Sequence, residues 1–376
     1  MRVAINAIND NDRLRGPDRY TMELVKALAD AGPEHHFLLF HAPWQEWYPE
    51  SLRASNIQCV RMSAPRSPYL RLPWQAGVFP LLVRRYRPDV VHLPNTIFTM
   101  GLGHRVVVTF HDVAEFAFPE KFNAFRARVR RVAARAAARA AGRIVAVSDF
   151  TKREMVRFLG VHPDRITVVL EGVTAALHGD LNAEAIRRKY SLRGDFLLYV
   201  GQIEKTKNVE GLVRAFGRTR AALGGCDLIL AGNRGNAYET VMKTINELGL
   251  DGTVRHLGYV PEADLPGLFT SARALVFPSL VEGFGLVMLE AMVHGVPVIA
   301  SNAGSLPEVA GGAAVLVPPG DEGALSDAMA RVLRDGVLRE SLSRKGRDRA
   351  REFSWSRAAR EMLGVYESLH AREATR

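Results

Sequence analysis

The sequence predicts an α/β protein built on two doubly wound parallel sheets, each in a domain of its own. Three observations support this fold class. Short apolar runs without charged residues are typical of strands whose two faces are both covered by helices. These runs alternate with amphipathic helical patterns, and the alternation restarts near Phe196. A chain of 376 residues has the length of about two domains.

In the first half of the chain, continuous apolar runs alternate with segments that carry apolar residues at helical spacing. Strands are expected at Arg2–Asn6, Phe37–Phe40, Val90–Leu93, Val106–Phe110 and Ile144–Val147. Helices are expected from about Tyr20 to Ala31, from Asn123 to Arg143 and from Phe150 to Leu159, with a turn-rich stretch from Asn9 to Asp18.

The second half repeats this architecture without repeating the sequence. Strands are expected at Phe196–Val200, Asp227–Ala231, Arg255–Leu257, Ala274–Phe277, Val298–Ser301 and Ala314–Val317, with helices at Val209–Ala222 and Tyr238–Leu248. The connection from Glu171 to Gly194 is the expected boundary. It separates an N-terminal domain over residues 1–180 from a C-terminal domain over residues 181–356.

The composition is that of an ordinary globular protein, with 47% hydrophobic and 24% charged residues. It excludes low-complexity disorder, collagen-like repetition and a disulfide-stapled mini-protein. Cys59 and Cys226 allow at most one disulfide, which suits a reducing compartment. The start of the chain has no secretory pattern, and no apolar run approaches the roughly 20 residues of a membrane span. We therefore expect a cytoplasmic protein.

The positive charge is concentrated in the first half of the chain. The net charge is +10, and residues 1–180 carry 25 Lys and Arg against 17 Asp and Glu, an excess of 8. Such an excess favours an anionic partner. Nucleic acid, an anionic membrane surface and a phosphorylated substrate are the candidates at this stage.

The most informative segment runs from Phe277 to Met292. A strand ends at Pro278, a glycine-containing turn follows, and a helix begins near Phe284. Free N–H groups at a helix start bind anions, and the glycines let a phosphate approach the backbone. Phosphate repels carboxylates, so Glu282 and Glu290 are expected to accept hydrogen bonds from neutral hydroxyls. A nucleotide sugar meets both demands. The alternative is that Glu282 caps the helix and Glu290 is solvated.

Two Glu residues eight positions apart, in the stretch from Glu282 to Met292, resemble the signature of retaining glycosyltransferases of family 4 with the GT-B fold. Similar stretches occur at residues 198–208, 257–261, 295–301, 304–308 and 353–355. The resemblance implies two Rossmann-like domains that face each other across a cleft. It also implies that the last helix, at about residues 357–376, crosses back to the first domain.

The resemblance assigns donor-binding roles position by position. Glu282 would contact the hydroxyls of the donor sugar, and Glu290 would hold the ribose hydroxyls. Lys207 would neutralise the diphosphate as it leaves. The phosphates would rest on the amides of Phe284, Gly285 and Leu286. A fixed ammonium and a helix N-terminus supply positive charge, so we expect no metal and no cofactor beyond the nucleotide-sugar co-substrate.

Further donor contacts are expected at the ends of neighbouring strands. The segment around Tyr259 and Val260 resembles the one that receives the base. Gln202 stands where relatives often carry Arg, and its alternative is a plain strand-end residue. Arg234 is a second phosphate candidate, and its alternative is a solvated surface residue.

In the N-terminal half, His111 and Asp112 follow a strand, at the sheet edge where open α/β sheets bind ligands. The resemblance places this His beside the donor sugar and the reaction centre, so His111 joins Lys207 and Glu282 as a catalytic candidate. Ser148 and Lys152 resemble another cleft-lining segment. The alternative for Ser148 is a helix cap.

The loop at Gly16 would lie against the diphosphate, but it departs from the more glycine-rich loop of relatives. Pro17 and Asp18 follow it, and Asp18 puts the phosphate contact in doubt or indicates an acceptor that needs a carboxylate. Glu171 replaces a more usual Asn.

A predicted Arg-rich helix from Asn123 to Arg143 carries its arginines among alanines. At about 100° per residue, one stripe is formed by Arg128, Arg131, Arg135, Arg139 and Arg143. This stripe is either a solvated face or a contact with anionic lipid.

The resemblance implies a retaining glycosyltransferase that moves a sugar from a nucleotide-diphosphate sugar, with GDP-mannose favoured over UDP-sugars. The acceptor would be a glycan or a lipid-linked hydroxyl in cell-surface polysaccharide synthesis, at the inner face of the cytoplasmic membrane. A nucleotide-sugar epimerase or hydrolase, and a non-catalytic sugar-nucleotide or lipid-binding protein, are the alternatives. No zinc-like spacing, Walker loop or aromatic–basic module occurs, so no metal or nucleic acid is expected.

Overall fold

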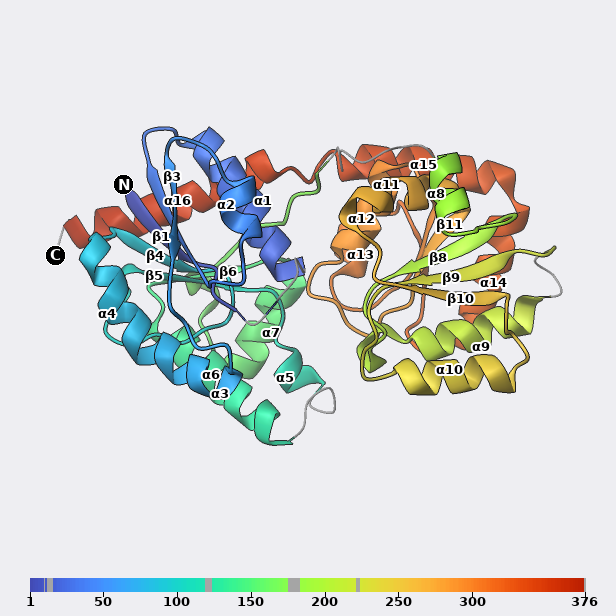
Figure 1. The fold of residues 1–376 in the computed structure, drawn as a ribbon, viewed down its shortest axis with the longest axis horizontal. Helices are drawn as coiled ribbons and strands as arrows, with labels where there is room; N and C mark the ends of the chain where they lie inside the picture. The colour runs from blue at the N-terminus through green and yellow to red at the C-terminus, as the bar shows by residue number, and fades with distance from the viewer. Residues whose placement is uncertain (10, 12–15, 119–123, 175–182, 221–223, 375–376) are drawn as a thin grey trace. The chain divides into compact units, whose positions relative to one another are not determined.

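The computed structural model describes residues 1–9, 11, 16–118, 124–174, 183–220 and 224–374. The chain forms two compact units, each built on one parallel sheet with helices on both faces (Figure 1), which confirms the predicted fold class. Unit 1 comprises Met1–Gly172 and Ser354–Arg376, and unit 2 comprises Val173–Phe353. The predicted boundary at residues 180 and 181 lies outside the described residues.

The sheet of unit 1 has seven parallel strands in the order β3-β2-β1-β4-β5-β6-β7. The strands are β1 (Arg2–Asn6), β2 (His36–His41), β3 (Ile57–Arg61), β4 (Val90–Leu93), β5 (Val106–Phe110), β6 (Arg143–Ala146) and β7 (Ile166–Val168). The strand order changes direction between β1 and β4, since the chain adds β2 and β3 on one side of β1 and β4 to β7 on the other. At such a reversal, the loops that follow the two strands diverge and leave a crevice for a ligand.

Helices cover both faces of this sheet. They are α1 (Gly16–Ala31), α2 (Trp47–Ser51), α3 (Pro68–Pro73), α4 (Phe79–Val83), α5 (Ala114–Ala117), α6 (Ala124–Ala140), α7 (Asp149–Leu159) and α16 (Trp355–Ala374). One hydrophobic cluster joins α4, α6 and α7 to alternate strand residues, through side chains such as Phe79, Ala137 and Met155. The helices α1 and α16 pack against each other, and α16 also contacts β4.

The sheet of unit 2 has six parallel strands in the order β10-β9-β8-β11-β12-β13. The strands are β8 (Phe196–Val200), β9 (Asp227–Ala231), β10 (Val254–Gly258), β11 (Ala274–Phe277), β12 (Val298–Ser301) and β13 (Val315–Val317). Its order reverses between β8 and β11. The helices are α8 (Ala183–Lys189), α9 (Val209–Thr219), α10 (Tyr238–Glu247), α11 (Leu265–Ser271), α12 (Leu286–Val293), α13 (Leu306–Ala310), α14 (Glu322–Arg334) and α15 (Gly336–Ala350).

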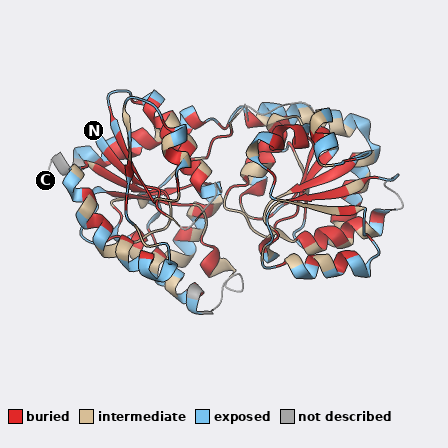
Figure 2. Cartoon of the chain, viewed as in Figure 1, coloured by how far each residue is buried: buried red, intermediate tan, exposed pale blue. Residues whose placement is uncertain are grey.

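Burial explains why the sequence pattern located most strands. The central strands of both sheets are buried almost throughout, while the edge strands are only partly buried and the helices expose their outward faces (Figure 2). The prediction missed β3 and β7, which are the edge strands of the first sheet. Gln58 and Arg61 of β3 and Thr167 of β7 interrupt the apolar pattern, because an edge strand is covered on fewer sides.

The predicted Arg-rich helix is too long at its C-terminal end. The helix α6 ends at Ala140, and Arg143 instead begins β6, where it pairs with Val107 of β5. Arg143 therefore does not belong to the arginine stripe. The predicted helix ends at Asn123 and Ala222 lie outside the described residues.

A buried polar link ties α16 to the first sheet. The His92 ring on β4 lies 2.8 Å from the Tyr366 hydroxyl through Nδ1, and 2.8 Å from Thr109 Oγ1 through Nε2. Burial lowers the pKa of His92 to about 3, and the nearby charge of His111 adds to this effect. The ring is therefore neutral at neutral pH, and both of its nitrogens are hydrogen-bonded within the protein.

We predict that Tyr366→Phe lowers the free energy of unfolding by about 1–3 kcal/mol, because it leaves a buried His92 nitrogen without a partner. Denaturant unfolding measures this loss. Tyr69→Phe is the matched control, since Tyr69 is 67% exposed. Equal stability of the two variants would show that the link contributes nothing.

Candidate active site

The order reversal of the second sheet brings together the loops that follow β8 and β11. The first loop leads into a short 3₁₀ turn at Lys205–Lys207, and the second leads to the start of α12. The backbone N–H of Leu280 donates to the carbonyl of Thr206 at 2.8 Å. The two loops are thus joined directly at the position where this fold binds ligands.

An ion pair connects two of the predicted catalytic residues. Lys207 Nζ lies 2.5 Å from Glu282 Oε1, and the Ser279 hydroxyl donates to the same oxygen at 2.6 Å. The side chains of Lys207 and Glu282 are 23% and 13% exposed, so the pair is only partly open to solvent. The ammonium also lies 5.6 Å from the centre of the Phe277 ring. The Lys207 ammonium and the Glu282 carboxylate therefore lie side by side at the C-terminal ends of β8 and β11.

The backbone of the Glu282 loop is fixed by a neighbouring turn. The N–H and the hydroxyl of Ser305 both donate to the Glu282 carbonyl at 3.1 Å, and the hydroxyl also donates to the Phe284 carbonyl at 2.8 Å. Gly304 has a φ of +63°, and a Cβ there would lie 2.4 Å from the Glu282 carbonyl oxygen. Residues 304–308, to which the resemblance assigned no role, thus fix the backbone of the Glu282 loop.

The helix α12 begins immediately after this loop. Gly285, with a φ of +103°, is its N-cap residue, and no described side chain caps this end. The alternative in which Glu282 caps the helix is therefore wrong. Glu290 is 5% exposed within α12, so the alternative of a solvated Glu290 is wrong as well. An uncapped helix start next to an ammonium has the chemistry of an anion site.

The other predicted donor residues lie at the ends of β8, β9 and β10. Gln202 Nε2 donates to the Arg234 carbonyl at 3.3 Å, which agrees with a structural role for Gln202. The exposed Arg234 guanidinium lies 4.5 Å from the centre of the Tyr238 ring. Tyr259 is 40% exposed and Val260 is buried.

In unit 1, the His111 ring is held from three sides. Nδ1 lies 3.0 Å from Glu171 Oε1, and Nε2 lies 2.9 Å from the Pro94 carbonyl oxygen. The Tyr20 ring meets it edge-on, with the ring centres 4.6 Å apart. Burial lowers the pKa of His111, but Glu171, Pro94 and Asp112 together outweigh this effect, so the pKa is raised. Sequence reasoning noted Glu171 only as an unusual residue and missed its contact with His111.

Two neighbouring predicted residues have local structural roles. Ser148 is buried and is the N-cap of α7, where its hydroxyl accepts from the Thr151 N–H at 3.0 Å, so the capping alternative is confirmed. Asp112 Oδ1 accepts from the Ala114 N–H at 3.0 Å at the start of α5. Lys152 is half-buried in the first turn of α7.

The loop at Gly16 is organised around a buried carboxylate. Gly16 is the exposed first residue of α1, whereas Asp18 is fully buried. The Asp18 carboxylate accepts from the Asn9 and Asn11 amides at 2.5 and 2.6 Å and from the Tyr48 hydroxyl at 3.3 Å. This carboxylate joins Asn9, Asn11 and Tyr48 to the start of α1. The interpretation of Asp18 as an acceptor-binding group is therefore wrong.

The arginine stripe of α6 is divided between two environments. Arg128, Arg135 and Arg139 are exposed, whereas Arg131 is half-buried and donates to the Glu115 carbonyl at 2.6 Å. The Arg135 guanidinium lies 5.0 Å from the centre of the Phe116 ring.

In the part of the chain that the structure describes, no helix is both long and apolar enough to cross a membrane.

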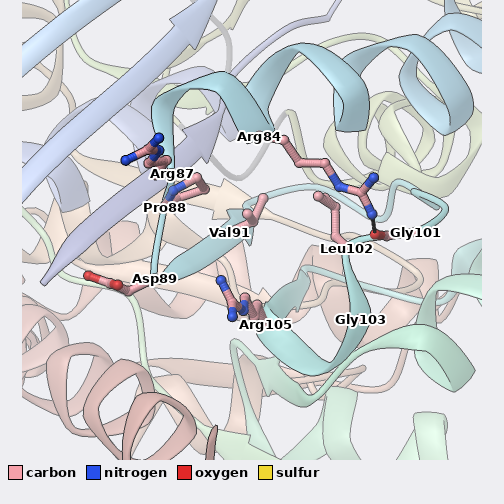
Figure 3. A pocket seen from close by; sticks show the side chains of 9 residues that line it. All are labelled: Arg84, Arg87, Pro88, Asp89, Val91, Gly101, Leu102, Gly103 and Arg105. Carbon is pink, nitrogen blue, oxygen red and sulfur yellow. Dashed lines mark hydrogen bonds between the residues drawn. The ribbon is translucent and has the colours of Figure 1, made fainter. Parts of the chain in front are cut away.

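A separate hollow of about 530 Å³ lies at the N-terminal ends of β4 and β5, because most of its lining residues precede these strands (Figure 3). Arg84, Arg87 and Arg105 line it. Arg84 donates to the Gly101 carbonyl, and the guanidinium groups of Arg84 and Arg87 point away from each other. Arg84 and Arg87 therefore do not converge on one anion. The described residues also contain no cluster of three His, Cys, Asp or Glu side chains that could hold a metal.

An alanine in the left-handed backbone conformation costs about 1–2 kcal/mol. We predict that Gly304→Ala lowers the free energy of unfolding by more than this amount. The reason is the collision of the new methyl group with the Glu282 backbone. Gly320→Ala is the matched control, because Gly320 has a φ of +79° with no atom within 4 Å of its Cβ position. Equal losses in denaturant unfolding would mean that the loop is not held as described.

Comparison with known proteins identifies both units. Residues 14–177 match the family described as "Glycosyltransferase Family 4", and residues 182–349 match "Glycosyl transferases group 1". The O-antigen chain mannosyltransferase B of Escherichia coli is 33% identical over 372 residues, which cover 95% of this chain and 97% of that protein.

Two solved structures share the fold over nearly the whole chain. Sucrose-phosphate synthase from Thermosynechococcus elongatus aligns with a TM-score of 0.80 and 22% identity, covering 99% of each chain. HepE from Anabaena, in complex with UDP and glucose, aligns with a TM-score of 0.77 and 18% identity, covering 98% of this chain and 100% of that chain. Two family models and a relative matched over its full length thus show that this chain belongs to the glycosyltransferases, as a transferase with the GT-B fold.

Proposed function

We propose that this transferase is a retaining mannosyltransferase of cell-surface polysaccharide synthesis. It moves a mannosyl group from GDP-mannose, with UDP-sugars as the next candidates, to a hydroxyl of a glycan or lipid-linked acceptor. The observation that carries the proposal is the Lys207–Glu282 pair beside the uncapped start of α12. The similarity to an O-antigen chain mannosyltransferase supports the choice of sugar and of pathway.

The ion pair gives the donor site its chemistry. In the structure, the Lys207 ammonium neutralises the Glu282 carboxylate. A bound diphosphate competes for the ammonium with its larger negative charge, and Glu282 is then free to accept hydrogen bonds from the sugar hydroxyls. The amides of Phe284, Gly285 and Leu286 take the phosphate oxygens. The ammonium and the helix start supply the positive charge of this mechanism, so it requires no metal.

Transfer breaks the bond between the anomeric carbon and the phosphate oxygen and forms a bond from the acceptor oxygen to the same carbon. The acceptor attacks from the face that the diphosphate leaves, so the configuration is retained. The transition state resembles an oxocarbenium ion, and the hydroxyl proton passes to the leaving phosphate. No carboxylate of the chain is assigned as a covalent nucleophile. Unit 2 binds the donor and unit 1 binds the acceptor.

We predict that Lys207→Gln lowers kcat by about 10²–10³-fold, because it removes a charge that stabilises the leaving diphosphate. Lys205→Gln is the matched control, since Lys205 lies in the same turn and is exposed. The measurement is transfer from a panel of GDP-, UDP- and ADP-sugars to a mannose-terminated glycan. Unchanged turnover in Lys207→Gln, or donor conversion that needs no acceptor, would contradict the proposal.

A lipid-linked acceptor would require this transferase to bind at the inner face of the cytoplasmic membrane. We propose that α6 makes the contact with the membrane. Its exposed stripe combines Arg128, Arg135 and Arg139 with Phe125 and Val132, which are 67% and 61% exposed. Arginines with exposed apolar side chains suit the surface of an anionic bilayer.

We predict that replacing Arg128, Arg135 and Arg139 by Glu abolishes sedimentation with anionic vesicles at low salt, because each arginine contributes about 1 kcal/mol near the surface. A control with the same change of charge replaces Arg331, Arg344 and Lys345, which are exposed in unit 2. If both variants bind like the wild type, α6 is an ordinary solvated helix.

A further inference from the structure

The hydrogen bonds of His111 define its protonation state. Nδ1 faces the Glu171 carboxylate at 3.0 Å, and Nε2 faces the Pro94 carbonyl at 2.9 Å. Both partners are acceptors, and the carbonyl can be nothing else. A neutral imidazole has a single N–H and would leave one of the two contacts without a proton. With Glu171 ionised, only the imidazolium satisfies both contacts at once; the alternative with the same number of protons is a neutral imidazole that accepts from a protonated Glu171.

The charged and titratable groups around the ring favour the cation. Glu171 follows β7 and is 4% exposed, so its charge is poorly screened by water. Asp112, the next residue in the chain, adds a second negative charge. From β4, His92 faces the ring as a neutral group, and from α1, Tyr20 presents a ring edge without charge. Burial opposes the cation, but the acceptors outweigh it.

The position of Glu171 is fixed by its own backbone. The next residue, Gly172, lies directly against the start of α16, the helix with which the chain re-enters unit 1. A Cβ at Gly172 would lie only 2.3 Å from the Trp355 N atom. The Trp355 ring in turn packs against Tyr20, with ring centres 5.8 Å apart. Glu171, Tyr20 and His111 therefore form one packed group. The backbone next to Glu171 therefore has little room to shift.

We propose that Glu171 is a positioning residue that holds His111 as an imidazolium, so that His111 enters the reaction as a fixed positive charge and not as a proton acceptor. The inference rests on the proposed function and on the family resemblance, which implies that His111 lies beside the donor sugar. A permanent cation stabilises the negative charge that develops on the leaving group. It also explains why the acceptor proton must pass to the leaving phosphate, since His111 has no free nitrogen to receive it.

The variant Glu171→Gln separates charge from shape, because the amide keeps an acceptor oxygen and loses the negative charge. The first readout is the titration of His111 by NMR in histidine-labelled protein, with His111→Gln identifying the signal. We expect the wild-type pKa to lie above 6.5 and the pKa in Glu171→Gln to fall by about 1–3 units. The control is Glu115→Gln, which removes another buried carboxylate of unit 1.

The second readout is the pH profile of transfer. We expect kcat of the wild type to fall as the pH rises through the His111 pKa, and to fall at correspondingly lower pH in Glu171→Gln, with KM for the donor changed less than kcat. Below both pKa values, the two proteins should have similar kcat. Glu115→Gln should keep the wild-type profile.

A wild-type His111 pKa at or below 6.5 overturns the inference, and this test does not depend on the folding of any variant. An unchanged His111 titration in Glu171→Gln also overturns it, as does a shifted titration without a shifted activity profile. If no donor supports transfer, the proposed function fails. The NMR titration still decides whether Glu171 holds the imidazolium, so the two failures are distinguishable.

Discussion

The ion pair between Lys207 and Glu282 is possible only because two loops from distant parts of the chain meet at one place. The lysine follows β8 and the glutamate follows β11, and these are the strands at which the sheet order reverses. A hydrogen bond between Leu280 and Thr206 joins the loops, and Ser305 fixes the glutamate's backbone from the next strand connection. The helix α12 begins just beyond the pair without a side-chain cap. The Lys207 ammonium and the N-terminus of α12 therefore bring two sources of positive charge close together.

The first unit uses the same topology for a different purpose. Its sheet also reverses order, between β1 and β4, and the residues that follow β4, β5 and β7 meet around His111. There the local charges are negative and raise the pKa of His111, while the buried Asp18 accepts hydrogen bonds from the amides of Asn9 and Asn11. Thus Lys207 and Glu282 form a pair that the proposed donor would open, whereas both ring nitrogens of His111 already have partners. This difference suits one site that exchanges ligands and another that stays preorganised.

The fold and the burial of the residues proposed to bind the donor were predictable where they depend on local patterns. Central strands are buried on both faces and so appear as unbroken apolar runs, and the Glu282–Met292 stretch carries its chemistry within one turn and one helix. The edge strand β3 was missed because polar residues interrupt it. The contact between Glu171 and His111 spans 60 positions, and no local pattern encodes it. Asp18 was misinterpreted for the same reason, since its partners include Tyr48, which lies 30 positions away.

The most direct test of the central claim is a crystal structure with a nucleoside diphosphate bound. The account predicts that the diphosphate oxygens lie within hydrogen-bond distance of Lys207 Nζ and of the amides that open α12, with the Glu282 carboxylate released from the lysine. A diphosphate bound elsewhere, with Lys207 still paired to Glu282, would contradict it.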